Sequence, residues 1–122
     1  MEEKHIVFVY GTLKKGCRLN YMLNTSTYLG EAVTINKYKL HHISGLPMLE
    51  KEVEEDYITG DVYEVNDKVL QILDKVEGVP DLYVREEIYV MTENLFLKAY
   101  VYFINQKVLE TEKKYDRNYS YG

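Results

Sequence analysis

The sequence predicts an α+β fold, a small mixed β-barrel of about six strands with one clear helix and one short helix. Several runs rich in β-branched and aromatic residues follow one another with only turns between them, which does not fit an alternating strand–helix plan. One stretch carries apolar residues at regular helical spacing. A length of 122 residues fits a single domain, residues 1–122, with one core.

The aromatic residues favour a barrel or cleft with a partly polar lining. The chain has 13 Tyr, 3 Phe and no Trp. Because each Tyr ring carries a hydroxyl, we expect many of these rings to lie at half-hydrated surfaces instead of in a dry centre.

The first half of the chain predicts strands joined by short turns. The continuous apolar run Ile6–Tyr10 is typical of a strand buried on both faces, and Gly11 ends it. The elements expected next are a loop at residues 11–18, a short helical patch at 20–24, strands at 28–35 (interrupted by Gly30) and 38–43, and a loop at 44–47.

The second half predicts the main helix between further strands. Asn66 or Asp67 can cap this helix, and Gly78 with Pro80 ends it. Its apolar residues are Val69, Leu70, Leu73 and Val76. The other expected elements are a solvated acidic loop at 50–56, a strand at 57–65 with a bulge at Gly60, a hairpin of strands at 83–91 and 95–104, and a charged tail from 110 to 122.

Charge and cysteine content exclude several classes of protein. A net charge of −5 and a pI near 5.2 argue against nucleic-acid binding, which needs a basic stripe. The lone Cys17 forms no internal disulfide and suits a reducing compartment. The first residues lack the pattern of a signal peptide, and no apolar run approaches the ~18 residues of a membrane span. We therefore expect a cytoplasmic protein without membrane contact.

Histidines and cysteine offer no evident metal or nucleophile site. His41 and His42 are adjacent, so on a strand they point to opposite faces and cannot bind one ion together. His5 lies at a strand start, and Cys17 is expected to be a half-buried thiol. We predict no bound metal.

The turn after the first strand is the first candidate binding element. Gly11 lets the backbone leave a buried strand sharply, and successive amides in such a turn can converge on an anion. The spacing from Gly11 to Gly16 invites comparison with a phosphate-binding loop, but Cys17 and Arg18 replace its Lys and its Ser or Thr. A plain tight turn remains the alternative interpretation.

Glu77 is the second candidate. It lies four residues after Leu73 and seven after Leu70, so it shares their buried helix face, and it directly precedes Gly78. Burial and the negative end of the helix both favour a raised pKa, in the range useful to a general base. The alternative is that Glu77 pairs with Arg85 or bends out to solvent.

Three blocks of sequence resemble the gamma-glutamylcyclotransferase-like (AIG2-like) family. These blocks are Tyr10-Gly11-Thr12-Leu13-Lys14 with Gly16 and Asn20, Gly60-Asp61-Val62-Tyr63-Glu64-Val65, and Leu73-Asp74-Lys75-Val76-Glu77-Gly78-Val79-Pro80-Asp81-Leu82-Tyr83-Val84-Arg85. The spacing is closest to the gamma-glutamylamine cyclotransferase branch. The resemblance implies a small barrel with a cavity at its mouth, and a cofactor-free cyclisation of a γ-glutamyl compound to 5-oxoproline with release of an amine.

The resemblance also implies roles for particular residues. Glu77 matches the family's catalytic acid. Substrate binding falls on the loop Tyr10, Gly11, Thr12 and Leu13, and on the hydroxyl of Tyr83. Arg85 would orient the carboxylate of Glu77 or be structural, and Tyr115, next to Asp116, resembles a tail element that lies across the site.

Three functional hypotheses follow from these residues. The first is a cyclotransferase acting on a small γ-glutamyl amine or γ-glutamyl amino acid, as a monomer or homodimer without cofactor. The second is a non-catalytic domain that binds a small carboxylate or γ-glutamyl metabolite. The presence of Glu77 is evidence against this second hypothesis, because a buried acid disfavours an anionic ligand. The third is an interaction protein that assembles through its Tyr-rich surface.

Overall fold

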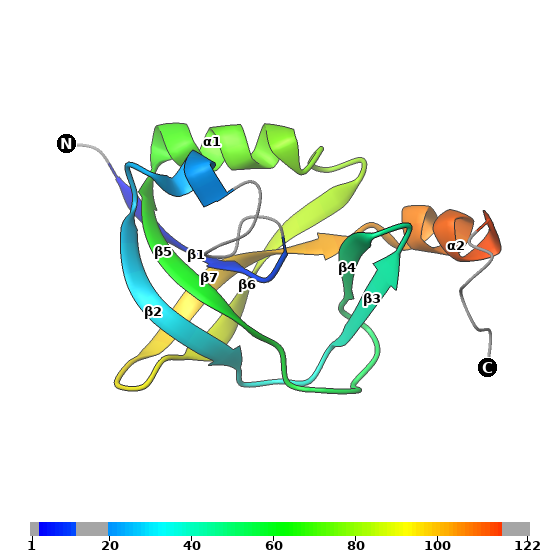
Figure 1. Cartoon of the computed structure of the whole chain (residues 1–122), viewed down its shortest axis with the longest axis horizontal. Coiled ribbons are helices and arrows are strands. Elements are labelled where there is room, and N and C mark those ends of the chain that lie inside the picture. Colours follow the sequence, from blue (N-terminus) through cyan, green and yellow to red (C-terminus); the bar gives the residue numbers. More distant parts are fainter. Residues whose placement is uncertain (1–2, 12–19, 116–122) are drawn as a thin grey trace.

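The computed structural model describes residues 3–11 and 20–115, and this part of the chain holds seven strands, two α-helices and one 3₁₀-helix (Figure 1). In chain order they are β1 (Lys4–Val9), the 3₁₀-helix η1 (Asn20–Leu23), β2 (Thr27–Thr34), β3 (Lys39–Ile43), β4 (Leu46–Glu50), β5 (Thr59–Asn66), α1 (Asp67–Val76), β6 (Tyr83–Met91), β7 (Phe96–Ile104) and α2 (Gln106–Tyr115). The α+β class is confirmed, and the ends of the predicted strands are correct to within two residues.

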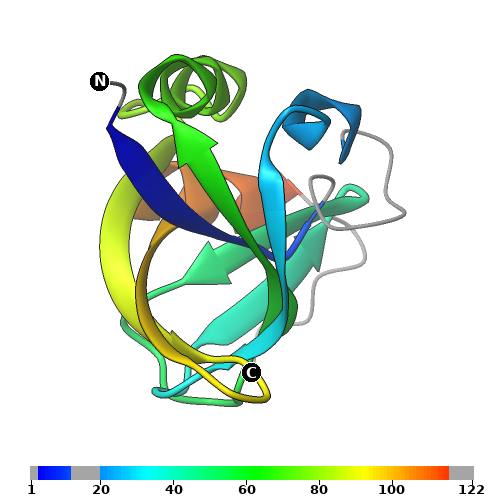
Figure 2. The same ribbon diagram turned by 90° about the vertical axis from the view of Figure 1, so that its left-hand side faces the viewer.

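Five of the strands close into a barrel in the order β1-β5-β2-β6-β7 (Figure 2). Antiparallel ladders join β1 to β5, β5 to β2, and β6 to β7. The other two seams are short: β2 meets β6 at two residue pairs, and β1 meets β7 in parallel at Val7 and Tyr100. The barrel is therefore a strongly curled sheet whose ring closes through few backbone pairs.

The core has two parts, and β1 contributes to both. Phe8 belongs to one buried cluster, together with residues of β5, β6 and β7 such as Val62 and Val101. Val7 and Val9 belong to the other, which includes the apolar face of α1. Successive side chains of β1 thus enter different clusters, which confirms that this strand is buried on both faces.

The bulge lies at a different glycine from the predicted one. The register of β2 against β5 shifts between Tyr28 and Gly30, and Gly30 has a φ of +123°. Gly60 instead permits a close approach of strands, because a Cβ there would lie 2.4 Å from the carbonyl oxygen of Val9 and 2.7 Å from the ring of Phe8.

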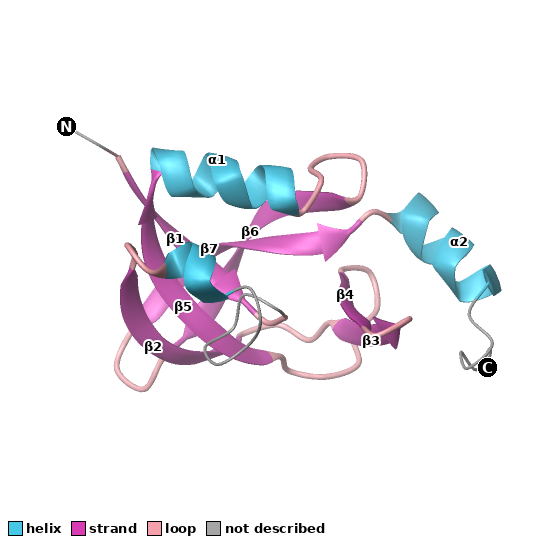
Figure 3. Cartoon of the chain, turned by 45° about the horizontal axis from the view of Figure 1, so that its top comes forward, coloured by secondary structure: helices cyan, strands magenta, loops and turns pink. Residues whose placement is uncertain are grey.

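β3 and β4 form a separate two-stranded sheet beside the barrel, and α2 lies next to it (Figures 1 and 3). The chain enters and leaves this hairpin through Tyr38 and Asp56, whose main-chain groups exchange hydrogen bonds of 2.8 and 3.0 Å. Glu50 of β4 is buried and accepts hydrogen bonds from His41 (2.9 Å) and from Gln106 of α2 (3.0 Å). Glu50 therefore joins the hairpin to α2.

Two sequence predictions around this hairpin were wrong. The loop expected at residues 44–47 is only a turn at Ser44 and Gly45, because β4 begins at Leu46 and accommodates Pro47 as a strand that pairs on one side alone. Glu50 was expected in a solvated loop. Burial acts to raise the pKa of Glu50, yet the hydrogen bonds from His41 and Gln106 hold this pKa below its ordinary value.

The helix α2 is an element that the sequence pattern did not predict. It is highly charged, and its main inward anchor is the fully buried Leu109, with Val108 packed partly against the same cluster. Because so few apolar residues face the core, the helical period is weak. The expected short helix is the 3₁₀-helix η1.

Candidate active site

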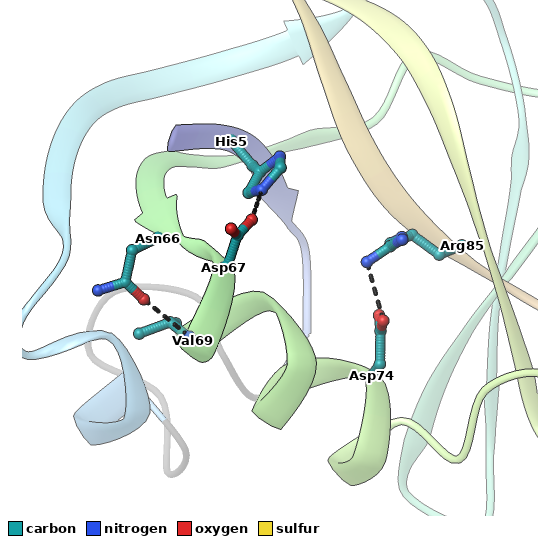
Figure 4. Close-up of polar contacts among 6 residues, drawn as sticks. All are labelled: His5, Asn66, Asp67, Val69, Asp74 and Arg85. Atoms are coloured by element: carbon teal, nitrogen blue, oxygen red, sulfur yellow. Dashed lines mark hydrogen bonds and ion pairs between the residues drawn. The ribbon is translucent and has the colours of Figure 1, made fainter. Parts of the chain in front are cut away.

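Glu77 lies where α1 ends. The side chain of Asn66 accepts a hydrogen bond from the amide of Val69 (2.9 Å) and caps the start of the helix (Figure 4). The buried residues Val69, Leu70 and Leu73 hold the helix against the barrel. At the other end the amide of Glu77 bonds to the carbonyl of Leu73, and Gly78, with a φ of +64°, ends the helix as predicted.

The carboxyl group of Glu77 is half-buried, and burial raises its pKa from the ordinary 4.5 to about 7. Within the described part of the chain, no ion pair of Glu77 is found. Arg85 pairs instead with Asp74 on α1, at 2.8 Å. The alternative in which Arg85 neutralises Glu77 directly is thus not the arrangement in the structure. A carboxyl group with a pKa near 7 can both accept and donate a proton at neutral pH.

Three tyrosines lie near this carboxyl group: Tyr10 directly after β1, Tyr83 at the start of β6 and Tyr102 in β7. Burial and then the charge of Glu77 raise the pKa of Tyr83 to about 12. Burial, the charge of Tyr83 and that of Glu77 raise the pKa of Tyr10. Burial, the hydrogen bond and charge of Asp74, and the charge of Glu77 likewise raise the pKa of Tyr102. The end of β1, the start of β6 and the end of β7 therefore converge on the carboxyl end of α1.

The hydroxyl groups of these tyrosines fix the surrounding backbone. Tyr10 donates to the carbonyl oxygen of Tyr102. Tyr83 donates to the carbonyl oxygen of Pro47 at 2.9 Å, and Tyr102 donates to Asp74 at 2.8 Å. As a result, β1, β6, β7, α1 and the β3–β4 hairpin are linked by hydrogen bonds next to Glu77.

Gly11 brings the first loop against the hairpin. A Cβ at this position would lie only 2.7 Å from Cγ of Pro47. A side chain here would push β4 away from the end of β1, so the need for glycine comes from this close approach. Thr12 and Leu13, expected to bind substrate, lie outside the described residues, as does Cys17, and their roles stay predictions.

The structure brings Tyr10, Gly11, Glu77 and Tyr83 into one region, and three further residues that were not expected to have a role lie there too. Pro47 was assigned to a loop with no role. Tyr102 falls within the strand expected at 95–104 and was given no role, and Asp74 was noted only as part of the resemblance. The spacing of Asp74 three residues before Glu77 was a usable signal, since side chains so spaced are neighbours on a helix.

The remaining predicted features lie elsewhere or are not tested. Tyr115 is the last residue of α2, and its side chain is outside the described residues, so its role as a lid stays a prediction. In the described ranges, one group of potential metal ligands occurs, Glu3, His5 and Asp67. It lies at the opposite end of α1 from Glu77, where His5 already pairs with Asp67 (Figure 4). Neither described α-helix is long and apolar enough to cross a membrane.

The chain is similar to several known proteins over most of its length. The sequence profile of the family described as "Gamma-glutamyl cyclotransferase, AIG2-like" matches residues 7–121. A protein of Methanocaldococcus jannaschii named "Putative gamma-glutamylcyclotransferase" is 33% identical over 99 residues, which are 80% of this chain and 82% of that protein. The "Gamma-glutamylaminecyclotransferase" of Bos taurus is 34% identical over 108 residues, 79% of this chain and 63% of that protein.

The fold is also similar to solved structures of AIG2-like proteins. The crystal structure of an AIG2-like protein from Mus musculus superimposes with a TM-score of 0.76 at 26% identity. The match covers 83% of this chain and 77% of the mouse protein.

Proposed function

Because the chain belongs to the gamma-glutamyl cyclotransferase, AIG2-like family, we propose that it is a cyclotransferase in which Glu77 is the catalytic acid and base. The observation that carries the proposal is the half-buried carboxyl group of Glu77, whose pKa burial raises to about 7. Family membership supports γ-glutamyl cyclotransferase-type activity. The bovine relative's name supports a γ-glutamyl amine as the substrate.

The reaction is an intramolecular acyl transfer. The α-amino nitrogen of a γ-glutamyl group forms a bond to its own γ-carbonyl carbon, and the bond from that carbon to the amine breaks. The products are 5-oxoproline and the free amine, and no water or cofactor is consumed. Since both reacting groups belong to one molecule, holding it in a folded conformation supplies much of the rate.

Glu77 moves the proton that this reaction must transfer. The substrate's α-ammonium group loses a proton before it attacks, and the leaving amine gains one. Because burial raises the pKa of Glu77 to about 7, its carboxyl group can accept a proton as a carboxylate and donate one as an acid at neutral pH.

The surrounding residues bind and orient the substrate in this proposal. Backbone amides of the loop Tyr10, Gly11, Thr12 and Leu13 hold the α-carboxylate and the γ-carbonyl oxygen. The Tyr83 hydroxyl already donates to Pro47, and it retains a lone pair that can accept a hydrogen bond from the substrate's ammonium group. Tyr115 closes over the bound molecule.

Release of 5-oxoproline from a panel of γ-glutamyl amines and γ-glutamyl amino acids tests the proposal. We expect turnover by the wild type and a loss of about 10²- to 10⁴-fold in Glu77→Gln, the usual contribution of a general acid–base group. Glu93→Gln, which changes an exposed carboxylate in the β6–β7 turn, is the matched control and should retain full activity. Equal turnover by wild type and Glu77→Gln would refute the role of Glu77, and saturable binding without product would favour a binding domain.

A further inference from the structure

Asp74, which forms an ion pair with Arg85, lies one helical turn before Glu77. Asp74 is three residues before Glu77 on α1, so their side chains are neighbours, with Cβ atoms about 5–6 Å apart by helix geometry. Arg85 reaches Asp74 from β6, at 2.8 Å (Figure 4). Both partners are about one-quarter exposed, at 27% and 26%, so solvent screens their charges only partly.

The pair is part of a network that fixes the end of α1. One carboxylate oxygen of Asp74 accepts from Arg85 and the other accepts from the hydroxyl of Tyr102. The carbonyl oxygen of Tyr102 accepts from Tyr10, so the network extends from α1 through β6 and β7 to the end of β1. The guanidinium group of Arg85 also lies 4.6 Å from the centre of the Tyr100 ring, which holds it in place.

A single ion next to Glu77 would change the charge state of that carboxyl group. An uncompensated Asp74 would repel the ionised form of Glu77, and an uncompensated Arg85 would attract it. Burial is the cause that raises the pKa of Glu77, as expected if the charges of Asp74 and Arg85 compensate each other. The charges of Asp74, Arg85 and Glu77 all act on the pKa of Tyr102, so the three groups lie near its hydroxyl.

We propose that Asp74 and Arg85 are positioning residues that hold the end of α1 as a neutral pair, so that neither charge alone acts on Glu77. The pair acts through Glu77 and not on the substrate. The relevance to catalysis rests on the proposed function, but the effect on the protonation of Glu77 does not. In the described part of the chain, the other titratable groups near Glu77 are Tyr10 directly after β1, Tyr83 of β6, Tyr102 of β7 and Lys75 on α1.

The test is to remove each charge separately and then both together. Arg85→Met leaves Asp74 alone and should raise the midpoint of Glu77 ionisation. Asp74→Asn leaves Arg85 alone, keeps an oxygen for the Tyr102 hydroxyl, and should lower that midpoint. Each shift should be roughly half a pH unit or more. The double variant should return near the wild-type midpoint, and Arg85→Lys, which keeps the charge, should stay close to it.

Two measurements report the midpoint independently. The first is the ¹³C NMR titration of the Glu77 carboxyl carbon, assigned by its absence in Glu77→Gln, and it requires no activity. The second is the acid limb of kcat/KM for 5-oxoproline release. If the wild type has no activity, the proposed function fails, while the NMR titration still decides this inference. Opposite shifts of the two single variants support it, and shifts in the same direction, or changes in stability alone with an unchanged midpoint, overturn it.

Discussion

The same carboxyl group that suits Glu77 for proton transfer should make the folded protein less stable at neutral and alkaline pH. Burial raises its pKa from 4.5 to about 7 on folding. Below pH 4.5 the group is protonated in both folded and unfolded chains and contributes no penalty. Between pH 4.5 and 7 the unfolded chain ionises first, so the folded state loses stability as pH rises. Above pH 7 the loss is complete, at about 3 kcal/mol.

Glu77→Gln keeps the size of the side chain but cannot ionise, so it should remove this penalty. We expect the variant and the wild type to have similar free energies of unfolding at pH 4. At pH 8 the variant should be more stable by up to about 3 kcal/mol. Urea unfolding followed by circular dichroism at several pH values measures the difference.

Comparison at each pH removes the contributions of all other titrating groups, since the two proteins share them. Glu93→Gln changes an exposed carboxylate and should give a difference that does not vary with pH. The reasoning fails if the Glu77→Gln difference is the same at pH 4 and pH 8, or if the variant is the less stable protein at pH 8.

Two further predictions concern the fold that holds the site. Gly60→Ala should destabilise the protein by at least about 2 kcal/mol, because the added Cβ would lie 2.4 Å from the Val9 carbonyl oxygen and 2.7 Å from the ring of Phe8; a midpoint in urea equal to the wild type's would contradict this. Asn66→Ala removes the cap that bonds to the amide of Val69 and should cost about 1 kcal/mol in thermal or urea unfolding, while Asn66→Asp, which keeps an accepting oxygen, should cost much less.

The sequence predicts those parts of the fold that depend on neighbours along the chain. The helix α1 carries its own start at Asn66, its apolar face and its end at Gly78, so its limits and the exposure of Glu77 follow from a short window. The hairpin of β6 and β7 is equally local. Together with Gly11, which ends β1, these local signals predict that Glu77 lies at a helix end and that a loop begins at Gly11.

Contacts between distant segments are what the sequence does not predict. Glu50 is the first residue of an acidic stretch and looks solvated in the sequence, yet its oxygens accept hydrogen bonds from His41, nine residues before it, and from Gln106, 56 residues after it. The bond from the Tyr83 hydroxyl to the Pro47 carbonyl likewise spans 36 residues. Such contacts depend on how the barrel closes, and no local pattern encodes them.

The hairpin of β3 and β4 is an insertion whose own hydrogen-bond ladder is separate from those of the barrel. The chain departs toward it and returns through one bridge, between Tyr38 and Asp56, so the hydrogen-bond ladders of the barrel run without it. Exchange or lengthening of residues 39–55 would leave the register of every barrel strand intact. Exchange is limited where the hairpin packs on the rest of the protein: Ile43, Met48 and Leu49 are buried in the core, Pro47 fits against Gly11, and Glu50 accepts from Gln106. Substitutions at the exposed positions of this hairpin can therefore change one side of the protein while the barrel strands keep their register.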